Sequence, residues 1–321
     1  MKFKVFIDGE AGTTGLRINE RLKDRDDIIL LSIDPELRKD PEERKKLINE
    51  ADIAFLCLPD DAARESVSLL DPNNKHTKII DTSTAHRTLD SFAYGFPELD
   101  DSFKNKIKTN QLIANPGCYA SGFISIAYPL VHKNITPSDY PFAITAISGY
   151  SGAGKKGIAQ YEDSNRSTEF DAPRLYGMGQ THKHLNEMKA IVGLDINPVF
   201  NPIVSNFYSG MMVSTGIEVS YMKKKMSAKE LRDLLAEYYN KENSLVKVMP
   251  FNEKGTDSGF LSAGLLSSYD NMYLFVNGND DRICITALYD NLGKGASGAA
   301  IQNMNLALGR SVKTGLLVKE D

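Results

Sequence analysis

The feature that most constrains this chain is the alternation of short apolar strand patterns with helical patterns in its first third. The segments with a strand pattern are 3–8, 28–34, 52–58 and 78–81. Helical patterns occupy 15–23 and 60–70, and Asp40-Pro41 with Glu43 predicts a third helix start, with N-cap, N1 and N3 signals. Repeated βα units build a parallel sheet with right-handed crossovers. The sequence therefore predicts an α/β chain that opens with a doubly wound, Rossmann-type sheet.

The pattern changes after residue 118. Residues 211–222 alternate apolar and polar side chains, which predicts a half-buried antiparallel strand whose inward face runs from Val213 to Tyr221. Ser227 and Glu230 form a capping box that opens a helix reaching about residue 240. The second region is therefore predicted to be α+β.

Two further patterns lie near the end of the chain. Strand patterns at 272–276 and 282–289 flank the turn 277–280, which predicts a hairpin and thus an antiparallel sheet. A glycine-rich turn at 293–298 leads into a final helix over 299–308.

Composition excludes several classes of function. The net charge is −4 over 321 residues, without a long basic run, so nucleic-acid binding is not expected. No apolar run approaches the roughly 18 residues of a membrane span, and no secretory signal precedes the first strand. The three cysteines are odd in number and lack zinc-site spacing, which favours a reducing cytoplasm and no metal.

A glycine-rich turn joins the first strand to the first helix. Its residues with the expected role are Gly9, Gly12, Thr13, Thr14 and Gly15. Glycines let the backbone approach a pyrophosphate, whose charge is met by the N–H groups of the helix N-terminus. The spacing G-x-x-G-x-x-G differs from the standard G-x-G-x-x-G, so the strand–turn–helix context carries the prediction. The alternative is a tight turn that binds no ligand.

The end of the second strand leaves the choice of dinucleotide open. Asp34 stands where an acidic residue would bind a ribose 2′-hydroxyl, which suggests NAD. Arg38 follows closely and could neutralise a 2′-phosphate, which suggests NADP.

The segment 115–120, Asn-Pro-Gly-Cys-Tyr-Ala, contains the candidate nucleophile. Pro116 and Gly117 shape a turn, and Cys118 immediately precedes an apolar helical stretch. A thiol at a helix N-terminus is favoured as thiolate by the helix dipole. The alternative is a small core residue, which we expect for Cys57 and Cys284 because both lie in apolar strand patterns.

A histidine pair supplies the candidate base. His182 and His184 lie at the start of a predicted helix with Thr181 as N-cap. The helix dipole disfavours imidazolium there, so His184 could accept a proton from a thiol, with Glu187 orienting the ring. A structural or surface histidine pair is the alternative.

Two cations are candidate anion ligands. Arg87 follows the strand at 78–81, at the sheet edge where ligands bind, and could clamp a phosphate or carboxylate. Lys155 lies in the second glycine-rich loop, 148–156. The alternative for Arg87 is a surface ion pair, and the alternative for the loop that contains Lys155 is a flexible hinge.

Together these motifs resemble one family almost end to end: N-acetyl-γ-glutamyl-phosphate reductase of arginine biosynthesis, in its shorter type. The matching segments are 8–15, 57–63, 83–87, 115–118, 148–152, 182–185 and 290–300. Asn186 departs from the family, which usually has proline there; proline would mainly stiffen the first helical turn, so we expect a small effect on His184.

The resemblance implies a two-domain fold like that of glyceraldehyde-phosphate and aspartate-semialdehyde dehydrogenases. Residues 1–117 and 293–321 would form the NADP-binding domain, and 118–292 the catalytic and oligomerisation domain. It also implies NADP as cofactor and a homodimer or homotetramer. The further cofactor contacts expected in the second region are Ser151, Gly152 and Asn291.

The resemblance also implies the reaction. Cys118 would attack the acyl phosphate of N-acetyl-γ-glutamyl phosphate and expel phosphate, and hydride from NADPH would reduce the thioester to the semialdehyde. His184 would act as acid and base, Arg87 would bind phosphate, and His182 and Lys155 would be further substrate contacts.

Three rival functions remain at this point. Aspartate-semialdehyde dehydrogenase shares the nucleophile and the nucleotide domain, although the His-x-His segment argues against it. A cysteine transferase or hydrolase would bind no dinucleotide. A binding module without catalysis would not need both Cys118 and His184.

Overall fold

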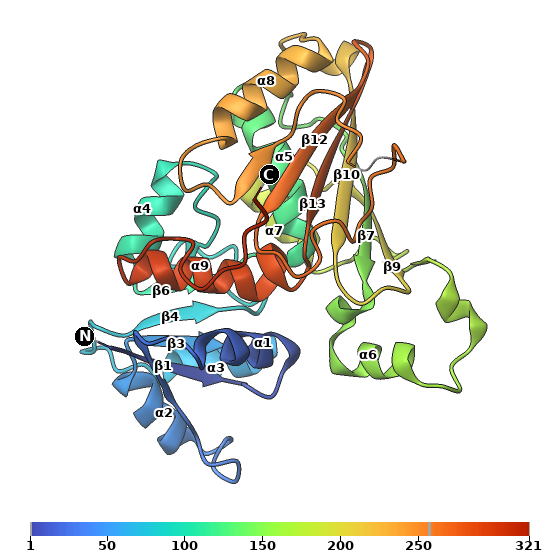
Figure 1. The fold of residues 1–321 in the computed structure, drawn as a ribbon. Helices are drawn as coiled ribbons and strands as arrows, with labels where there is room; N and C mark the ends of the chain where they lie inside the picture. The colour runs from blue at the N-terminus through green and yellow to red at the C-terminus, as the bar shows by residue number, and fades with distance from the viewer. Residues whose placement is uncertain (1, 256–257, 321) are drawn as a thin grey trace. The chain divides into compact units, whose positions relative to one another are not determined.

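The computed structural model describes residues 2–255 and 258–320, and the chain divides into two compact units (Figure 1). The first unit comprises residues 1–117 and 296–316, and the second comprises 118–295 and 317–321. The backbone therefore passes between the units three times. No helix in the described residues is long and apolar enough to cross a membrane.

The first unit contains a six-stranded sheet in the order β2-β1-β3-β4-β6-β5, in which every pair is parallel. The strands are β1 (Phe3–Asp8), β2 (Ile28–Leu31), β3 (Ile53–Leu56), β4 (Lys78–Asp81), β5 (Ala93–Tyr94) and β6 (Leu112–Ala114). The helices are α1 (Thr13–Leu22), α2 (Pro41–Glu50), α3 (Asp60–Ser68), α4 (Asp101–Thr109) and α9 (Gly298–Ala307). The predicted Rossmann-type sheet is confirmed.

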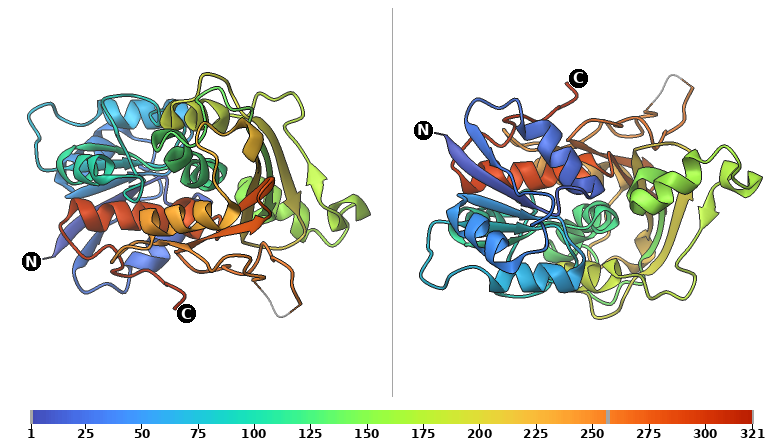
Figure 2. Two further views of the ribbon diagram at one scale, coloured as in Figure 1. Left: turned by 90° about the horizontal axis from the view of Figure 1, so that it is seen from above. Right: turned by 90° about the horizontal axis from the view of Figure 1, so that it is seen from below.

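Both faces of this sheet are buried, as parallel sheets require. On one face Val5, Phe55 and Ile80 pack with Ile18 of α1 and Met304 of α9. The final helix α9 runs along this sheet (Figure 2), although nearly 200 residues separate it from β6. The alternation of side chains along each strand sends neighbouring residues to the opposite face.

That opposite face of the sheet is covered by α2. Phe6, Leu56 and Ile79 pack there with Leu47 and Ile48, and each buried side chain contributes about 1.5–3 kcal/mol. The predicted start of α2 is confirmed, because the carboxylate of its N-cap Asp40 accepts from the Glu43 N–H.

The second unit contains a seven-stranded sheet in the order β11-β12-β13-β10-β7-β9-β8. Its strands are β7 (Ala143–Gly149), β8 (Arg174–Leu175), β9 (Val199–Ser205), β10 (Met211–Glu218), β11 (Val246–Val248), β12 (Met272–Gly278) and β13 (Arg282–Tyr289). The predicted β12–β13 hairpin is confirmed. The sheet is mixed rather than wholly antiparallel, because long connections allow β7 to pair with β9, and β11 with β12, in parallel.

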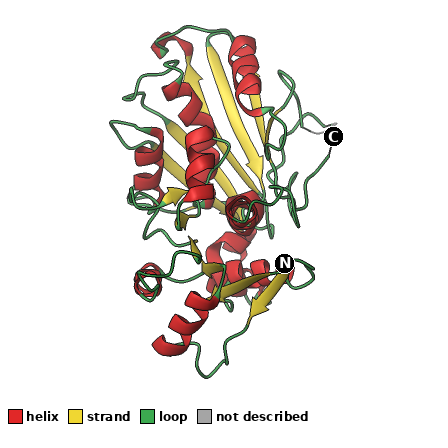
Figure 3. Ribbon diagram, turned by 90° about the vertical axis from the view of Figure 1, so that its left-hand side faces the viewer, coloured by secondary structure: helices red, strands yellow, loops and turns green. Residues whose placement is uncertain are grey.

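Helices cover one face of this second sheet (Figure 3). They are α5 (Cys118–His132), α7 (His184–Val192) and α8 (Ala228–Tyr239), whereas α6 (Gly154–Glu162) follows β7. The capping box of Ser227 and Glu230 at α8 is confirmed. Val213, Thr215 and Ile217 of β10 are buried as predicted, but Tyr221 is 66% exposed because the strand gives way to a 3-10 turn at Val219–Tyr221.

The other face of the second sheet carries exposed side chains. Ala143 and Thr145 of β7, Val199 of β9 and Cys284 of β13 all point to it. The prediction that Cys284 belongs to the core is wrong. Strand alternation buries its neighbours Ile283 and Ile285 and leaves Cys284 exposed.

Candidate active site

The glycine turn after β1 has the close packing that a dinucleotide-binding turn needs. Gly9 has φ +83, and a Cβ there would collide with the carbonyl oxygen of Cys57. A Cβ on Gly15 would lie 2.7 Å from the Gly9 oxygen. Gly12 is the N-cap of α1 and has no side chain to cap it, and the first turn of α1 has no acidic residue. Thr13 and Thr14 begin α1, so this helix N-terminus suits a pyrophosphate.

The two candidate ribose ligands, Asp34 and Arg38, both lie on the turn that follows β2. One oxygen of the Asp34 carboxylate accepts from the Glu36 N–H at 2.9 Å, so this side chain stabilises its own turn. Arg38 is exposed on the same turn. The Arg38 guanidinium is therefore accessible to a phosphate group, whereas one oxygen of the Asp34 carboxylate already accepts a hydrogen bond.

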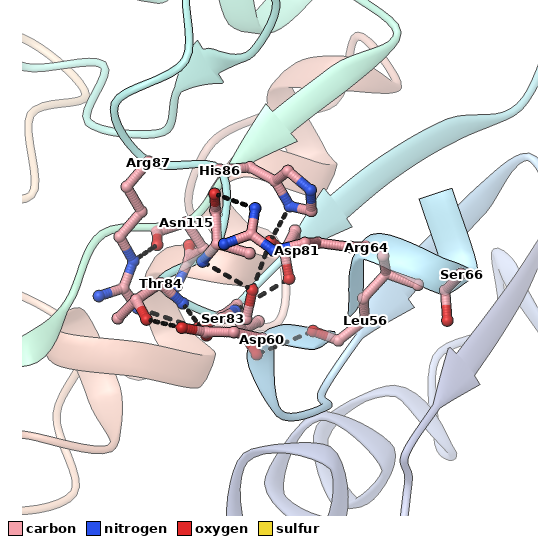
Figure 4. Close-up of polar contacts among 12 residues, drawn as sticks. Leu56, Asp60, Arg64, Ser66, Asp81, Ser83, Thr84, His86, Arg87 and Asn115 are labelled. Carbon is pink, nitrogen blue, oxygen red and sulfur yellow. Dashed lines mark hydrogen bonds and ion pairs between the residues drawn. The ribbon is translucent and has the colours of Figure 1, made fainter. Parts of the chain in front are cut away.

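A buried histidine–carboxylate pair lies at the end of β4 (Figure 4). The Asp81 carboxylate oxygen Oδ2 lies 2.6 Å from Nδ1 of His86 and accepts from the Ser83 hydroxyl at 2.7 Å. The His86 ring stacks on Phe92 with centroids 4.4 Å apart. His86 was not identified as a site residue from the sequence, although a carboxylate five residues earlier, at a strand end, was an available signal. This network organises residues 81–86, the loop that precedes Arg87.

Arg87 connects this loop to the Asn-Pro-Gly-Cys segment (Figure 4). Its Nε donates to the carbonyl oxygen of Asn115 and its Nη2 to that of Thr82, both at 2.9 Å. The side chain of Asn115 donates to the Ala296 oxygen at 3.0 Å and accepts from Asn303 at 3.0 Å. Asn115 is therefore held through its carbonyl and its amide, which positions the three residues before Cys118. Neither Asn115 nor Asn303 was identified as a site residue from the sequence.

Cys118 is the first residue of α5, so the predicted helix start is confirmed. The Tyr289 hydroxyl donates to the Cys118 carbonyl oxygen at 2.6 Å. A Cβ on Gly295 would lie 3.1 Å from the Cys118 Cβ, so the glycine permits a close approach. The Cys118 thiol thus lies, as expected, at the positive end of the α5 helix dipole, which favours the thiolate form.

The other two cysteines lack this setting. Burial raises the pKa of the Cys57 thiol to about 12, which keeps it protonated at neutral pH. Cys284 is exposed within β13 and does not begin a helix. None of the three cysteines forms a disulfide.

The rings of His182 and His184 lie near the ring of Tyr119, the residue that follows Cys118. The ring centroids of His182 and His184 are 4.8 Å apart, and they lie 5.9 Å and 6.1 Å from that of Tyr119. α7 begins at His184, and its N-cap is Lys183 rather than the predicted Thr181. Lys183 makes no side-chain cap hydrogen bond, and the first N–H of α7, that of His184, donates instead to Nδ1 of His182 at 3.1 Å.

Two tyrosines that sequence reasoning missed share this cluster. Burial, with the nearby Tyr176 and Cys118, raises the pKa of Tyr119 well above its usual range. Burial also raises the pKa of Tyr176 to about 12, partly offset by its hydrogen bond with Tyr119. Both hydroxyls therefore remain protonated beside Cys118 at neutral pH.

Three of the predicted cofactor residues also come together. The Asn291 amide donates to the Ser151 hydroxyl at 2.9 Å and accepts from the Gly210 N–H at 2.8 Å. A Cβ on Gly152 would lie 3.3 Å from that same amide nitrogen. Lys155 is exposed in the first turn of α6.

Family models match both parts of the chain. A semialdehyde dehydrogenase NAD-binding domain matches residues 4–108, and a semialdehyde dehydrogenase dimerisation domain matches residues 118–291. Among solved structures, aspartate semialdehyde dehydrogenase II from Vibrio cholerae has a TM-score of 0.69 at 16% identity, covering 96% of this chain and 99% of that chain. Aspartate semialdehyde dehydrogenase with NADP from Candida albicans has a TM-score of 0.62 at 15% identity, covering 97% and 100%. At this identity the likeness shows the fold.

Curated relatives are far more similar in sequence. N-acetyl-gamma-glutamyl-phosphate reductase 2 of Nostoc sp. is 45% identical over 323 residues, covering 98% of this chain and 99% of that protein. N-acetyl-gamma-glutamyl-phosphate reductase of Brucella ovis is 45% identical over 313 residues, covering 97% and 100%. The aspartate-semialdehyde dehydrogenase alternative is therefore not favoured. The chain belongs to the N-acetyl-γ-glutamyl-phosphate reductases, nicotinamide-dependent oxidoreductases of arginine biosynthesis.

Proposed function

We propose that this chain reduces N-acetyl-γ-glutamyl phosphate to N-acetylglutamate semialdehyde and phosphate through a thioester on Cys118. The observation that carries the proposal is Cys118 at the N-terminus of α5, with the rings of His182 and His184 packed on the adjacent Tyr119. The glycine turn after β1 and the N-terminus of α1 support dinucleotide binding in the first unit.

Cys118 acts as the nucleophile. Its sulfur lone pair forms a bond to the acyl carbon, and the carbonyl π pair moves onto oxygen. When that pair returns, the bond between carbon and the phosphate oxygen breaks, and phosphate leaves with the bonding electrons. The chain is left acylated at Sγ.

His184 is the proposed general base for the Cys118 thiol and the general acid for the reduced intermediate. As the first residue of α7 it lies at the positive end of a helix dipole, which favours the neutral ring that can take the thiol proton. The resulting imidazolium then protonates the oxygen of the reduced intermediate. When that hydroxyl returns its proton to His184, the carbon–sulfur bond breaks, and the aldehyde and thiolate separate.

Arg87 is the proposed phosphate ligand, and His182 and Lys155 are proposed substrate contacts. Arg87 is 8% exposed, and two of its N–H groups donate to main-chain oxygens. This anchoring supports a fixed guanidinium plane, which is the geometry that bidentate phosphate binding requires.

NADPH, when bound, supplies the hydride that reduces the thioester. Gly9, Gly12, Thr13, Thr14 and Gly15 would hold its pyrophosphate at the N-terminus of α1. Ser151, Gly152 and Asn291, which already contact one another, are the proposed contacts in the second unit.

Arg38 is proposed to bind the 2′-phosphate of NADP. We expect Arg38→Ala to raise the KM for NADPH about tenfold or more, the loss of one charge-assisted hydrogen bond, and to leave the KM for NADH unchanged. Steady-state kinetics with both cofactors measures this, with Lys225→Ala as a charge-matched control at an exposed site of the second unit. Equal effects on both cofactors would contradict the assignment of Arg38.

The proposed function is tested by phosphate-dependent reduction of NADP with N-acetylglutamate semialdehyde, beside aspartate semialdehyde and NAD as controls. We expect activity with the acetylated substrate and NADP. Activity with aspartate semialdehyde alone would reassign the substrate. No activity with any combination of substrate and cofactor, despite NADPH binding, would refute the proposed reaction and leave the fold assignment in place.

The second unit is proposed to form a homodimer, or a homotetramer built from dimers. Its family model is described as a dimerisation domain, and one face of its sheet carries the exposed side chains of Ala143, Thr145 and Val199. Light scattering that gives only the monomer mass of 35.5 kDa would contradict this proposal.

A cytoplasmic location is inferred from the three cysteines, none of which forms a disulfide, as suits a reducing compartment. Fractionation that recovers the protein outside the cytoplasm would overturn it.

A further inference from the structure

We propose that His182 acts as a neutral hydrogen-bond donor, through Nε2–H, to the substrate oxygen that becomes anionic during acylation and reduction at Cys118. Proton transfer is left to His184. This inference rests on the proposed function and assigns the two histidines of the His-x-His segment separate roles.

The tautomer of His182 follows from its hydrogen bond. Nδ1 accepts from the backbone N–H of His184 at 3.1 Å, and a ring nitrogen that accepts carries no proton. In the neutral ring the single N–H therefore lies on Nε2. His182 can donate through Nε2 and cannot use Nδ1 as a base without losing its hydrogen bond from the His184 N–H.

The surroundings of His182 keep the ring neutral. Burial, followed by the charge of Lys183, lowers the pKa of His182 to about 4. Its ring lies 5.1 Å from Phe200 of β9, 5.9 Å from Tyr119 of α5 and 6.0 Å from Tyr176 beside β8, measured between centroids. Both tyrosines are held protonated by burial, as described above. On α7 itself the titratable groups are His184, the buried Glu187 one turn on, and Lys189 in the last turn.

The loop that carries His182 is pinned to β9. The Gln180 amide accepts from the Phe200 N–H at 2.9 Å and donates to the Phe200 oxygen at 2.8 Å. Gln180 has φ 54, a left-handed conformation that costs a non-glycine residue about 1–3 kcal/mol. The Tyr176 N–H also donates to the Pro202 oxygen at 3.0 Å. The ring of His182 is thus held in place before substrate binds, which is what an oxyanion donor requires.

The chemistry needs such a donor twice. When the Cys118 sulfur bonds to the acyl carbon, the carbonyl π pair becomes an oxyanion, and it reverts to a carbonyl as phosphate departs. When hydride from the cofactor reaches the thioester carbon, the same oxygen again takes the π pair until His184 protonates it. A fixed N–H donor stabilises both anions without losing its own proton, and such a donor contributes about 10²–10³-fold in kcat.

The test compares His182→Asn with His182→Gln. An asparagine oxygen at position 182 can still accept from the His184 N–H, but its amide nitrogen falls short of the Nε2 position. A glutamine amide nitrogen reaches that position. We expect His182→Asn to lower kcat about 10²-fold with little change in KM, and His182→Gln to recover part of that loss. Both variants should keep the acid limb of the pH profile of kcat/KM.

Three kinetic outcomes would overturn the proposal. If the acid limb disappears in His182→Asn, His182 is the base. If KM rises and kcat is unchanged, His182 binds the ground-state substrate only. If glutamine is no better than asparagine, donation from Nε2 is not what matters.

A second measurement does not depend on activity. Nitrogen-15 NMR of histidine-labelled protein should show His182 as the Nε2–H tautomer, with no protonation until the pH approaches about 4. Titration of His182 near the ordinary histidine value of about 6.5 would overturn the proposal even in an active enzyme. Conversely, the expected NMR result in a protein that fails the semialdehyde assay would refute the proposed function and leave the state of His182 established.

Discussion

Cys118→Ser is expected to lower turnover by about 10⁴-fold or more, the scale on which removing a nucleophile acts. A serine hydroxyl is protonated at neutral pH and is a far weaker nucleophile than a thiolate at a helix N-terminus. NADPH binding should be unchanged, because Cys118 is not among the proposed cofactor contacts and the glycine turn with α1 belongs to the other unit. Steady-state assays, with fluorescence titration of NADPH, measure both quantities.

Cys284→Ser is the matched control for this experiment. Cys284 is the exposed thiol on β13, outside the proposed active site, so its substitution should leave kcat near that of the unmodified chain. Near-normal turnover in Cys118→Ser would rule out a thioester on Cys118. Loss of NADPH binding in that variant would instead indicate a folding defect.

His184→Asn is expected to lower kcat by about 10²–10⁴-fold at neutral pH, the usual contribution of a general acid–base group. The reason is that His184 takes the thiol proton and returns it to the reduced intermediate. The loss should shrink as the pH rises, because hydroxide and a preformed thiolate then replace the missing base. The pH profile of kcat measures this, and the acid limb should be absent in the variant.

His132→Gln provides the control for that substitution. His132 ends α5, roughly 20 Å along the helix from Cys118 at 1.5 Å per residue, and its ring stacks on Tyr128. Its replacement should leave the pH profile unchanged. A His184→Asn enzyme that keeps the acid limb would assign that limb to His182 or to solvent.

Local sequence patterns correctly predicted the helix starts that depend on only a few neighbouring residues. Asp40 and Ser227 cap the helices that the sequence assigned to them, because a cap involves only residues three apart. The thiol of Cys118 lies at a helix start for the same reason: Pro116 and Gly117 end one segment, and an apolar helical run follows.

Predictions failed where the partner lies far along the chain or where both faces of a strand are apolar. Cys284 sits in an apolar run, and only the pairing of β13 with β10 decides which of its residues point outward. Thr181 is a good capping residue in isolation, yet α7 begins at His184 with Lys183 as N-cap. The His184 N–H donates to the imidazole of His182, in a loop that Gln180 bonds to Phe200.

The sequence by itself determined the class of this protein: the βα repetition, the glycine turn, and the order of the motifs around Cys118, His184 and Arg87. These are properties of residues close together in the chain. Only the tertiary structure decided the partners of the site residues. Asn115 meets Asn303 across 188 positions, and Tyr289 meets Cys118 across 171. A single sequence cannot specify such pairs, because they exist only after sheets and helices have packed and buried polar groups have found partners that satisfy them.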